Sequence, residues 1–230
     1  MVKITGGHIM NRKIIALILT LLFVLGITIN SYAASNEYAD KLNKLGLFLG
    51  TENGYELDKP LTREQSAVML VRLLGVEQKV KEQIYSEVFV DVPYNRWSFN
   101  YVMYCYDNKI TNGTGADTFT PESNITAAEY VTLVLRLLGY TDVQPETAFD
   151  EGVRKYLFNS QRAKEIENKQ QFLREDMVYI TYRSLSVKNS DGKILARTLA
   201  DSGVLTNKQA DEFDIYSSGD LDDILDKLFE

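Results

Sequence analysis

Two stretches of the sequence repeat each other 64 residues apart: LTREQSAVMLVRLLG at residues 61–75 and ITAAEYVTLVLRLLG at residues 125–139. They align without a gap, and both end in Arg-Leu-Leu-Gly. A weaker third copy starts at Phe172 and runs to Leu185. Repetition at a regular spacing indicates a repeat architecture, in which small units bury their apolar faces against one another.

Each copy predicts an amphipathic helix with a defined start. Thr62 with Gln65, and Thr126 with Glu129, have the spacing of a capping box. In that motif the hydroxyl accepts a free amide of the first turn, and the third helical side chain reaches back to the cap residue. The third copy has Leu173 where the cap should be, so its start must be satisfied in another way.

The segment before each helix also recurs. Glycines lie in the loop that precedes it, and we expect Gly50 and Gly113 to occupy turns with positive φ. An aromatic-rich stretch, residues 97–107, predicts a further helix ahead of the second loop. One unit therefore reads as helix, loop, short extended piece and capped helix. The predicted units are residues 34–87, 88–146 and a degenerate third at 147–210.

Composition sets limits on function. The chain has 230 residues, 45% of them hydrophobic, with 25 Lys+Arg against 32 Asp+Glu. It holds enough apolar material for a core, whereas its net charge of −7 argues against nucleic acid as a partner. The single cysteine, Cys105, rules out an internal disulfide framework and is expected to be a small buried apolar residue.

Residues 1–33 have the pattern of a secretory signal peptide. A basic start precedes an uncharged apolar run at residues 14–29, and Ser31-Tyr-Ala33 resembles a cleavage site. Met10 is an alternative start to Met1. An uncleaved anchor is the other interpretation, but the run is shorter than the roughly 20 residues of a spanning helix. We therefore expect cleavage and no transmembrane segment in the mature chain.

Removal of this segment would also remove the one histidine, His8. Without imidazole, Ser-His-Asp and Cys-His nucleophilic sites and HExxH zinc sites are excluded. A pair of carboxylates could still hydrolyse a glycosidic bond, but no such motif stands out. We expect no catalytic residues, no metal site and no cofactor.

Residues 211–230 form an acidic tail with eight acidic residues and one lysine. Its apolar residues recur at helical spacing, which favours a short docked helix over a functional acidic arm. They are Leu221, Ile224, Leu225, Leu228 and Phe229.

At these motifs the sequence resembles the S-layer homology (SLH) family of secreted Gram-positive, clostridial-type proteins. The resemblance covers roughly residues 36–206. The second unit carries it most fully, in Phe89-Val-Asp91-Val92, Trp97, Ile110 to Gly113, Phe119-Thr-Pro121 and Ile125-Thr-Ala-Ala-Glu129. The first unit adds Gly46-Leu-Phe-Leu-Gly50 and Leu61-Thr-Arg-Glu-Gln65.

The resemblance implies a mainly α fold, with three repeats in a pseudo-threefold, three-pronged spindle around a helical bundle. It also implies secretion to the cell wall, where grooves between repeats bind secondary cell-wall polysaccharide, often pyruvylated. The family's binding arginine corresponds to Arg63 and Arg174, whereas the second unit has Ala127. A guanidinium suits a carboxylate ligand, and Trp97 and Tyr101 are secondary candidates because an aromatic face can stack on a sugar.

Other interpretations stay open at this point. Most first-turn arginines are simply solvated, and a lone tryptophan is more often a core residue than a ligand platform. The loss of arginine at Ala127 fits a second hypothesis, a structural module that keeps the fold and binds other envelope proteins. Wall binding requires Arg63 and Arg174 to face open grooves.

Overall fold

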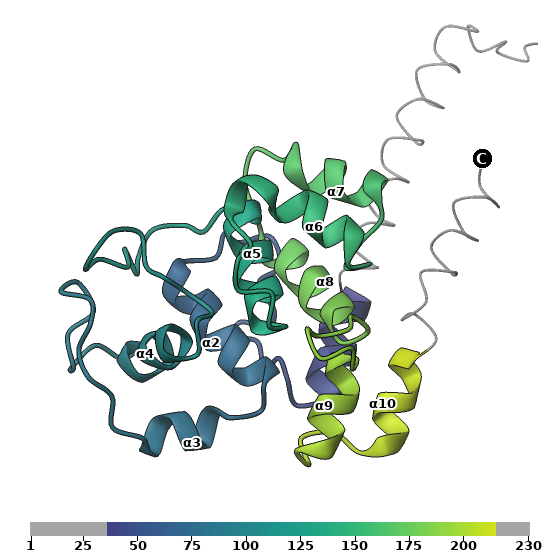
Figure 1. Ribbon diagram of the computed structural model, residues 1–230, viewed down its shortest axis with the longest axis horizontal. Helices are drawn as coiled ribbons and strands as arrows, with labels where there is room; N and C mark the ends of the chain where they lie inside the picture. Colours follow the sequence, from purple (N-terminus) through teal and green to yellow (C-terminus); the bar gives the residue numbers. More distant parts are fainter. Residues whose placement is uncertain (1–35, 215–230) are drawn as a thin grey trace, which may run out of the picture.

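The computed structural model describes residues 36–214, which form helices joined by loops and four isolated β-bridges (Figure 1). The prediction of a mainly α fold is confirmed for this part of the chain. The predicted signal peptide, and the predicted tail helix beyond Asp214, lie outside the described residues.

Three helices of 11 residues each correspond to the three sequence copies: α2 (Arg63–Leu73), α5 (Ala127–Leu137) and α8 (Arg174–Ser184). Figure 1 shows them in the middle of the molecule, and α5 packs against both α2 and α8. Their apolar faces are almost wholly buried in one continuous core. Burial of these faces against one another is the main source of stability for such short helices.

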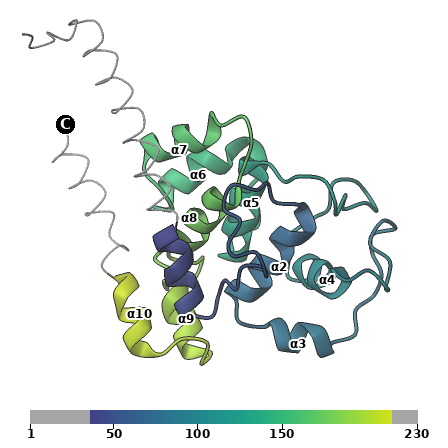
Figure 2. The same ribbon diagram turned by 180° about the vertical axis from the view of Figure 1, so that it is seen from behind.

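The other helices surround these three, and the view from behind shows the same grouping (Figure 2). On one side lie α3 (Glu77–Glu82) and α4 (Phe99–Asp107), and α4 packs on α2. α6 (Ala148–Arg154) packs on α5 and α7 (Ser160–Glu167), and the 3₁₀ turn η1 (Pro145–Thr147) precedes it. α9 (Leu195–Asp201) and α10 (Asn207–Asp214) pack together on the opposite side, and residues 36–44 are also helical.

Both predicted capping boxes are present. At α2 the Gln65 amide donates to the Thr62 hydroxyl over 3.3 Å, and the Gln65 side chain accepts the Thr62 amide over 3.1 Å. Thr126 and Glu129 make the same pair of contacts at α5. At α8, Leu173 makes no side-chain cap, as expected from its apolar side chain.

The two loop glycines have the backbone conformation that the sequence predicts. Gly50 has φ +72° and Gly113 has φ +80°. A Cβ at Gly113 would lie 2.5 Å from the Thr118 carbonyl oxygen and 2.6 Å from the Phe89 ring. Glycine is therefore required there for space as well as for conformation.

Two helices lie in polar stretches outside the repeated motifs. Residues 76–87 contain α3, and the stretch 160–171 is helical as far as Glu167. The three-pronged spindle with its unit boundaries stays a prediction. Within residues 36–214, no helix combines the length and apolar character needed to cross a bilayer.

Candidate functional site

At the starts of α2 and α8, an extended segment from another predicted unit accepts hydrogen bonds from the first backbone amides of the helix. The amides of Arg63 and Glu64 donate to the carbonyls of Ser123 and Pro121 over 2.9 and 3.1 Å. Segment 119–124, which precedes α5, therefore satisfies the free donors at the start of α2.

The same arrangement recurs at α8. There the amides of Arg174 and Glu175 donate to the carbonyls of Lys59 and Leu57 over 2.9 and 3.0 Å. Lys59 and Leu57 lie three and five residues before the cap of α2, just as Ser123 and Pro121 do before the cap of α5. The interlock satisfies the first two amides of α8, whereas the third amide, that of Asp176, which a side-chain cap would serve, donates to the Leu173 carbonyl over 3.1 Å. The interlock also places each first-turn arginine beside the start of another repeated helix, Arg63 beside α5 and Arg174 beside α2.

Arg63 does not meet the requirement that a wall-binding arginine face an open groove. Its side chain is only 6% exposed, and Nη1 donates to Glu129 Oε1 over 2.7 Å. Nε donates to the Phe119 carbonyl over 2.8 Å, and the guanidinium lies over the Phe119 ring. Burial lowers the pKa of Arg63, and the Glu129 carboxylate opposes this effect. Arg63 therefore links α2 to α5 and to the segment before it, and its side chain is almost wholly buried.

Arg174 occupies the corresponding position without a carboxylate partner. Arg63 contacts Glu129 at the third position of α5, and the corresponding third position of α2 is Gln65, which lines the same cavity as Arg174. A neutral amide cannot neutralise a guanidinium. No described residue makes an ion pair or side-chain hydrogen bond with Arg174, and its Nε is buried and unsatisfied. Burial lowers the pKa of Arg174, and the nearby charge of Glu56 opposes that shift.

A cavity of about 190 Å³ opens at this guanidinium. Arg174, Gln65 and Met177 line it together with Arg72 and Trp97, so all three predicted units contribute. Arg72 is held by Glu77, with its Nε 3.1 Å from Glu77 Oε2. The cavity thus combines Arg174, which makes no ion pair with a described residue, Arg72, which is paired with Glu77, and the aromatic side chain of Trp97.

Trp97 is exposed, which differs from the more common core role. It is 59% exposed and lies between the Arg174 cavity and a neighbouring hollow of about 310 Å³ that Tyr94 and Lys81 also line. An exposed indole beside a guanidinium offers a flat apolar surface to a ligand.

Tyr101 does not supply a second platform of this kind. It is 7% exposed, and its hydroxyl donates to Glu77 Oε1 over 2.7 Å. Its ring is packed into the core and its hydroxyl is bound to Glu77, so Tyr101 presents no open aromatic face to a ligand.

The third interface has no first-turn arginine. Ala127 stands at that position on α5, and the equivalent of Glu129 on α8 is Asp176. Lys169 takes over the charge compensation, with Nζ 2.7 Å from Asp176 Oδ1 and 2.8 Å from Glu175 Oε1. Burial still raises the pKa of Asp176, although Lys169 acts against it.

Sequence reasoning missed Gln65 and Arg72 as cavity residues. A signal for Gln65 was present, because the third position of the capped helix reads Gln, Glu and Asp in the three copies. Its meaning depends on which arginine faces which helix start, and this is a tertiary fact. Among residues 36–214 no cluster of His, Cys, Asp or Glu has an arrangement that could bind a metal ion.

Comparisons with known proteins agree with these motifs. Residues 89–131, from Phe89 through α4 into α5, match the family described as S-layer homology domain. The chain is 37% identical over 101 residues to a middle cell wall protein of Brevibacillus brevis, and 34% identical over 109 residues to a surface layer protein of Brevibacillus choshinensis. These alignments cover 44% and 47% of the chain.

A cellulosome-anchoring protein of Acetivibrio thermocellus is 26% identical over 84 residues, or 36% of the chain and 19% of that protein. In both Brevibacillus proteins the matched part is 10% of the full length. The chain therefore spans only a small part of these relatives.

Proposed function

Because residues 89–131 match the S-layer homology domain family, we propose that the chain attaches non-covalently to an acidic secondary polysaccharide of the cell wall through the Arg174 cavity. The relatives named as surface layer, cell wall and cellulosome-anchoring proteins support a location at the cell surface and a non-enzymatic anchoring role. We propose further that this polysaccharide is pyruvylated.

The observation that carries the proposal is the unpaired guanidinium of Arg174. Arg63 is occupied by Glu129, and the third helix start carries Ala127. Among the described residues, the Arg174 interface is thus the one in which a first-turn arginine has no carboxylate partner. A ligand carboxylate would supply the missing acceptor with paired, charge-assisted hydrogen bonds.

Binding has to be local. With residues 1–33 removed, the chain would hold 22 basic and 32 acidic residues, so its overall field repels an anionic polymer. A short-range contact to Arg174, with a sugar ring against the exposed face of Trp97, overcomes this repulsion only when the polymer is seated in the cavity. We expect affinity to change little with moderate salt, because a partly buried pair is weakly screened.

The chain carries its own reporter for this test. Trp97 is the single tryptophan, and it lies in the proposed site. Titration of the protein with purified acidic wall polysaccharide should change its fluorescence. Co-sedimentation should pellet it with intact wall sacculi and leave it in solution with sacculi stripped of that polysaccharide.

Arg174→Ala should weaken binding roughly tenfold to a hundredfold, as expected for loss of a hydrogen bond to a charged group. Arg154→Ala is the matched control, since Arg154 is exposed and lies outside the cavity. Equal binding by the two variants would refute the proposed site. Failure of every form to pellet with walls would leave the alternative of an envelope module that binds protein.

A further inference from the structure

Residues 215–230 follow α10, lie outside the described residues, and carry five carboxylates and one lysine. We propose that this segment docks in the Arg174 cavity of its own chain and competes there with the acidic wall polysaccharide. The competition rests on the proposed function, whereas the docking does not.

Charge complementarity favours this occupant. Arg174 makes no ion pair with a described residue, and its buried Nε lacks a hydrogen-bond acceptor. A carboxylate of the segment would supply that acceptor with a charge-assisted hydrogen bond. The acidic residues just before the segment already bind an arginine in this way, since Asp211 and Asp214 of α10 both accept from Arg197, and Asp211 Oδ1 does so over 2.6 Å.

The cavity also offers an apolar wall that suits a peptide. Five apolar side chains line it, all of them almost completely buried: Phe48, Leu61, Val68, Met69 and Met177. Aliphatic side chains gain from burial against such a wall, and methionines adapt to their shape, whereas sugar hydroxyls gain little. The segment places Leu and Ile directly beside its carboxylates, as LDDILD at residues 221–226. It therefore matches both the guanidinium and the apolar part of the lining.

The described end of the chain lies close enough to the cavity. The Phe213 ring of α10 packs on the Tyr182 ring of α8, with ring centroids 5.4 Å apart. Tyr182 lies eight residues beyond Arg174 on α8, which is about 12 Å along the helix axis. Asp220 and Asp226 follow Phe213 by seven and thirteen residues, and extended chains of those lengths reach up to about 25 and 45 Å. The carboxylates can therefore reach Arg174 without any displacement of α10.

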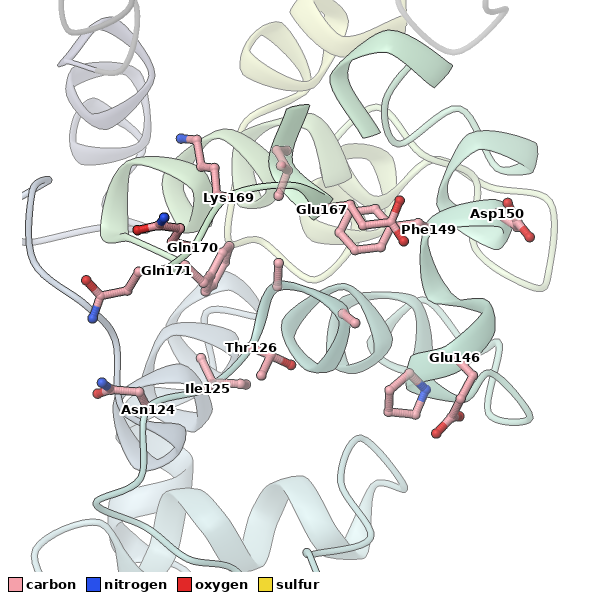
Figure 3. A pocket seen from close by; sticks show the side chains of 15 residues that line it. Asn124, Ile125, Thr126, Glu146, Phe149, Asp150, Glu167, Lys169, Gln170 and Gln171 are labelled. Atoms are coloured by element: carbon pink, nitrogen blue, oxygen red, sulfur yellow. The ribbon is translucent and has the colours of Figure 1, made fainter. Parts of the chain in front are cut away.

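A cavity of about 540 Å³ at the start of α5 offers the segment no comparable site (Figure 3). Lys169 is the one basic side chain of its lining, and it is already bound by Asp176 and Glu175 at 2.7 and 2.8 Å. Three carboxylates line the same cavity: Glu146, Asp150 and Glu167. They would repel an acidic segment, so the charge of the two linings directs it to Arg174.

Trp97 fluorescence tests the docking without any polysaccharide, because Trp97 is the single tryptophan and lines the Arg174 cavity. The test variant of the full chain removes four carboxylates of the segment: Asp220→Asn, Asp222→Asn, Asp223→Asn and Asp226→Asn. The control variant changes the net charge equally, at four exposed residues outside the cavity: Asp117→Asn, Asp142→Asn, Glu146→Gln and Glu167→Gln.

We expect the fluorescence of Trp97 to change in the test variant but not in the control, and the change to disappear in the Arg174→Ala background. A synthetic peptide of residues 215–230, added in excess to the test variant, should restore the spectrum of the parent chain. Identical spectra of the test variant and the parent chain would overturn the docking. A difference that is lost on dilution would also overturn it, because the occupant would then be the segment of a second copy.

Titration with purified acidic wall polysaccharide tests the competition. A tethered segment acts at an effective concentration of order mM, and a single charged contact with apolar neighbours binds with a Kd of about 1 mM. Affinity for the polysaccharide should therefore rise roughly twofold to tenfold in the test variant relative to the control. Equal affinities of the two variants would overturn the competition. If no form binds polysaccharide, the proposed function fails together with the competition, while the docking is still decided by fluorescence alone.

Discussion

Exchanging one side chain should give Arg174 an internal carboxylate partner of the kind that Arg63 already has in Glu129. Gln65→Glu places a carboxylate at the position where Glu129 meets Arg63 at 2.7 Å. Glutamate at this helical position also preserves the capping box, as Glu129 does at α5. The variant should therefore fold normally and pair Arg174 internally.

The size of the effect follows from what the pair replaces. A ligand carboxylate on Arg174 makes charge-assisted hydrogen bonds worth roughly 1.5–3 kcal/mol. An internal carboxylate removes that gain, so affinity for acidic wall polysaccharide should fall roughly tenfold to a hundredfold. The free energy of unfolding should rise by about 1 kcal/mol, because a half-buried charge gains a partner.

The reciprocal exchange is the matched comparison. Glu129→Gln keeps a capping side chain but leaves the guanidinium of Arg63, only 6% exposed, without a carboxylate. The unfolding free energy should fall by about 2 kcal/mol, less than for a fully buried pair because Glu129 is 29% exposed.

Urea unfolding gives the stability changes and Trp97 fluorescence gives the affinities. The reasoning is refuted if Gln65→Glu binds acidic polysaccharide as tightly as the parent chain. It is also refuted if both exchanges shift stability in the same direction, since the two helix starts would then not be equivalent.

Three further predictions concern stability and reactivity. Cys105 is buried, and burial raises its pKa to about 12. A thiol reagent at pH 8 should therefore label it only when the protein unfolds. Labelling of the native protein at the rate of a free thiol would contradict this. Burial raises the pKa of Glu77, but hydrogen bonds, led by that from Arg72, outweigh burial and hold the pKa at about 2. Its pKa is therefore lower in the folded chain, and its contribution to stability, full above the unfolded value of about 4.3, should be lost as the pH falls towards 2. Acid titration of unfolding should show a shallower loss for Glu77→Gln, and an identical slope would contradict the assignment. Gly113→Ala should lower the free energy of unfolding by about 1–3 kcal/mol, because φ +80° and the nearby Thr118 carbonyl both oppose a Cβ. Calorimetry should show a lower melting temperature. A Gly192→Ala control, at a turn with open space around the glycine, should show a smaller fall.

The local features of the fold could be read from the sequence because they depend on neighbouring residues. A threonine followed three residues later by Gln or Glu determines where α2 and α5 begin. Loop glycines mark turns that need positive φ. The apolar spacing of the repeated helices predicts which face is buried. α3 was missed because its six residues, EQKVKE, bury only Val80 and show no apolar face.

The candidate site could be predicted only in part. Arg174 and Trp97 were identified by the motif alone, and the structure places them around one cavity. Arg63 has the same motif and the same helix position, yet its guanidinium is buried and paired with Glu129. Nothing within its own copy distinguishes it from Arg174, because its partner lies 66 residues away.

The sequence by itself determined the repeated units, the helix starts, the glycine turns and the positions of the first-turn arginines, since each follows from rules that act within a few residues. Only the tertiary structure decided which of the two arginines lacks a carboxylate partner among the described residues. The interlock pairs the first turn of one repeated helix with the third position of another, so that Glu129 neutralises Arg63 while Gln65 cannot neutralise Arg174. Charge compensation acts through space between segments far apart in the chain, and for that reason the local pattern could not reveal it.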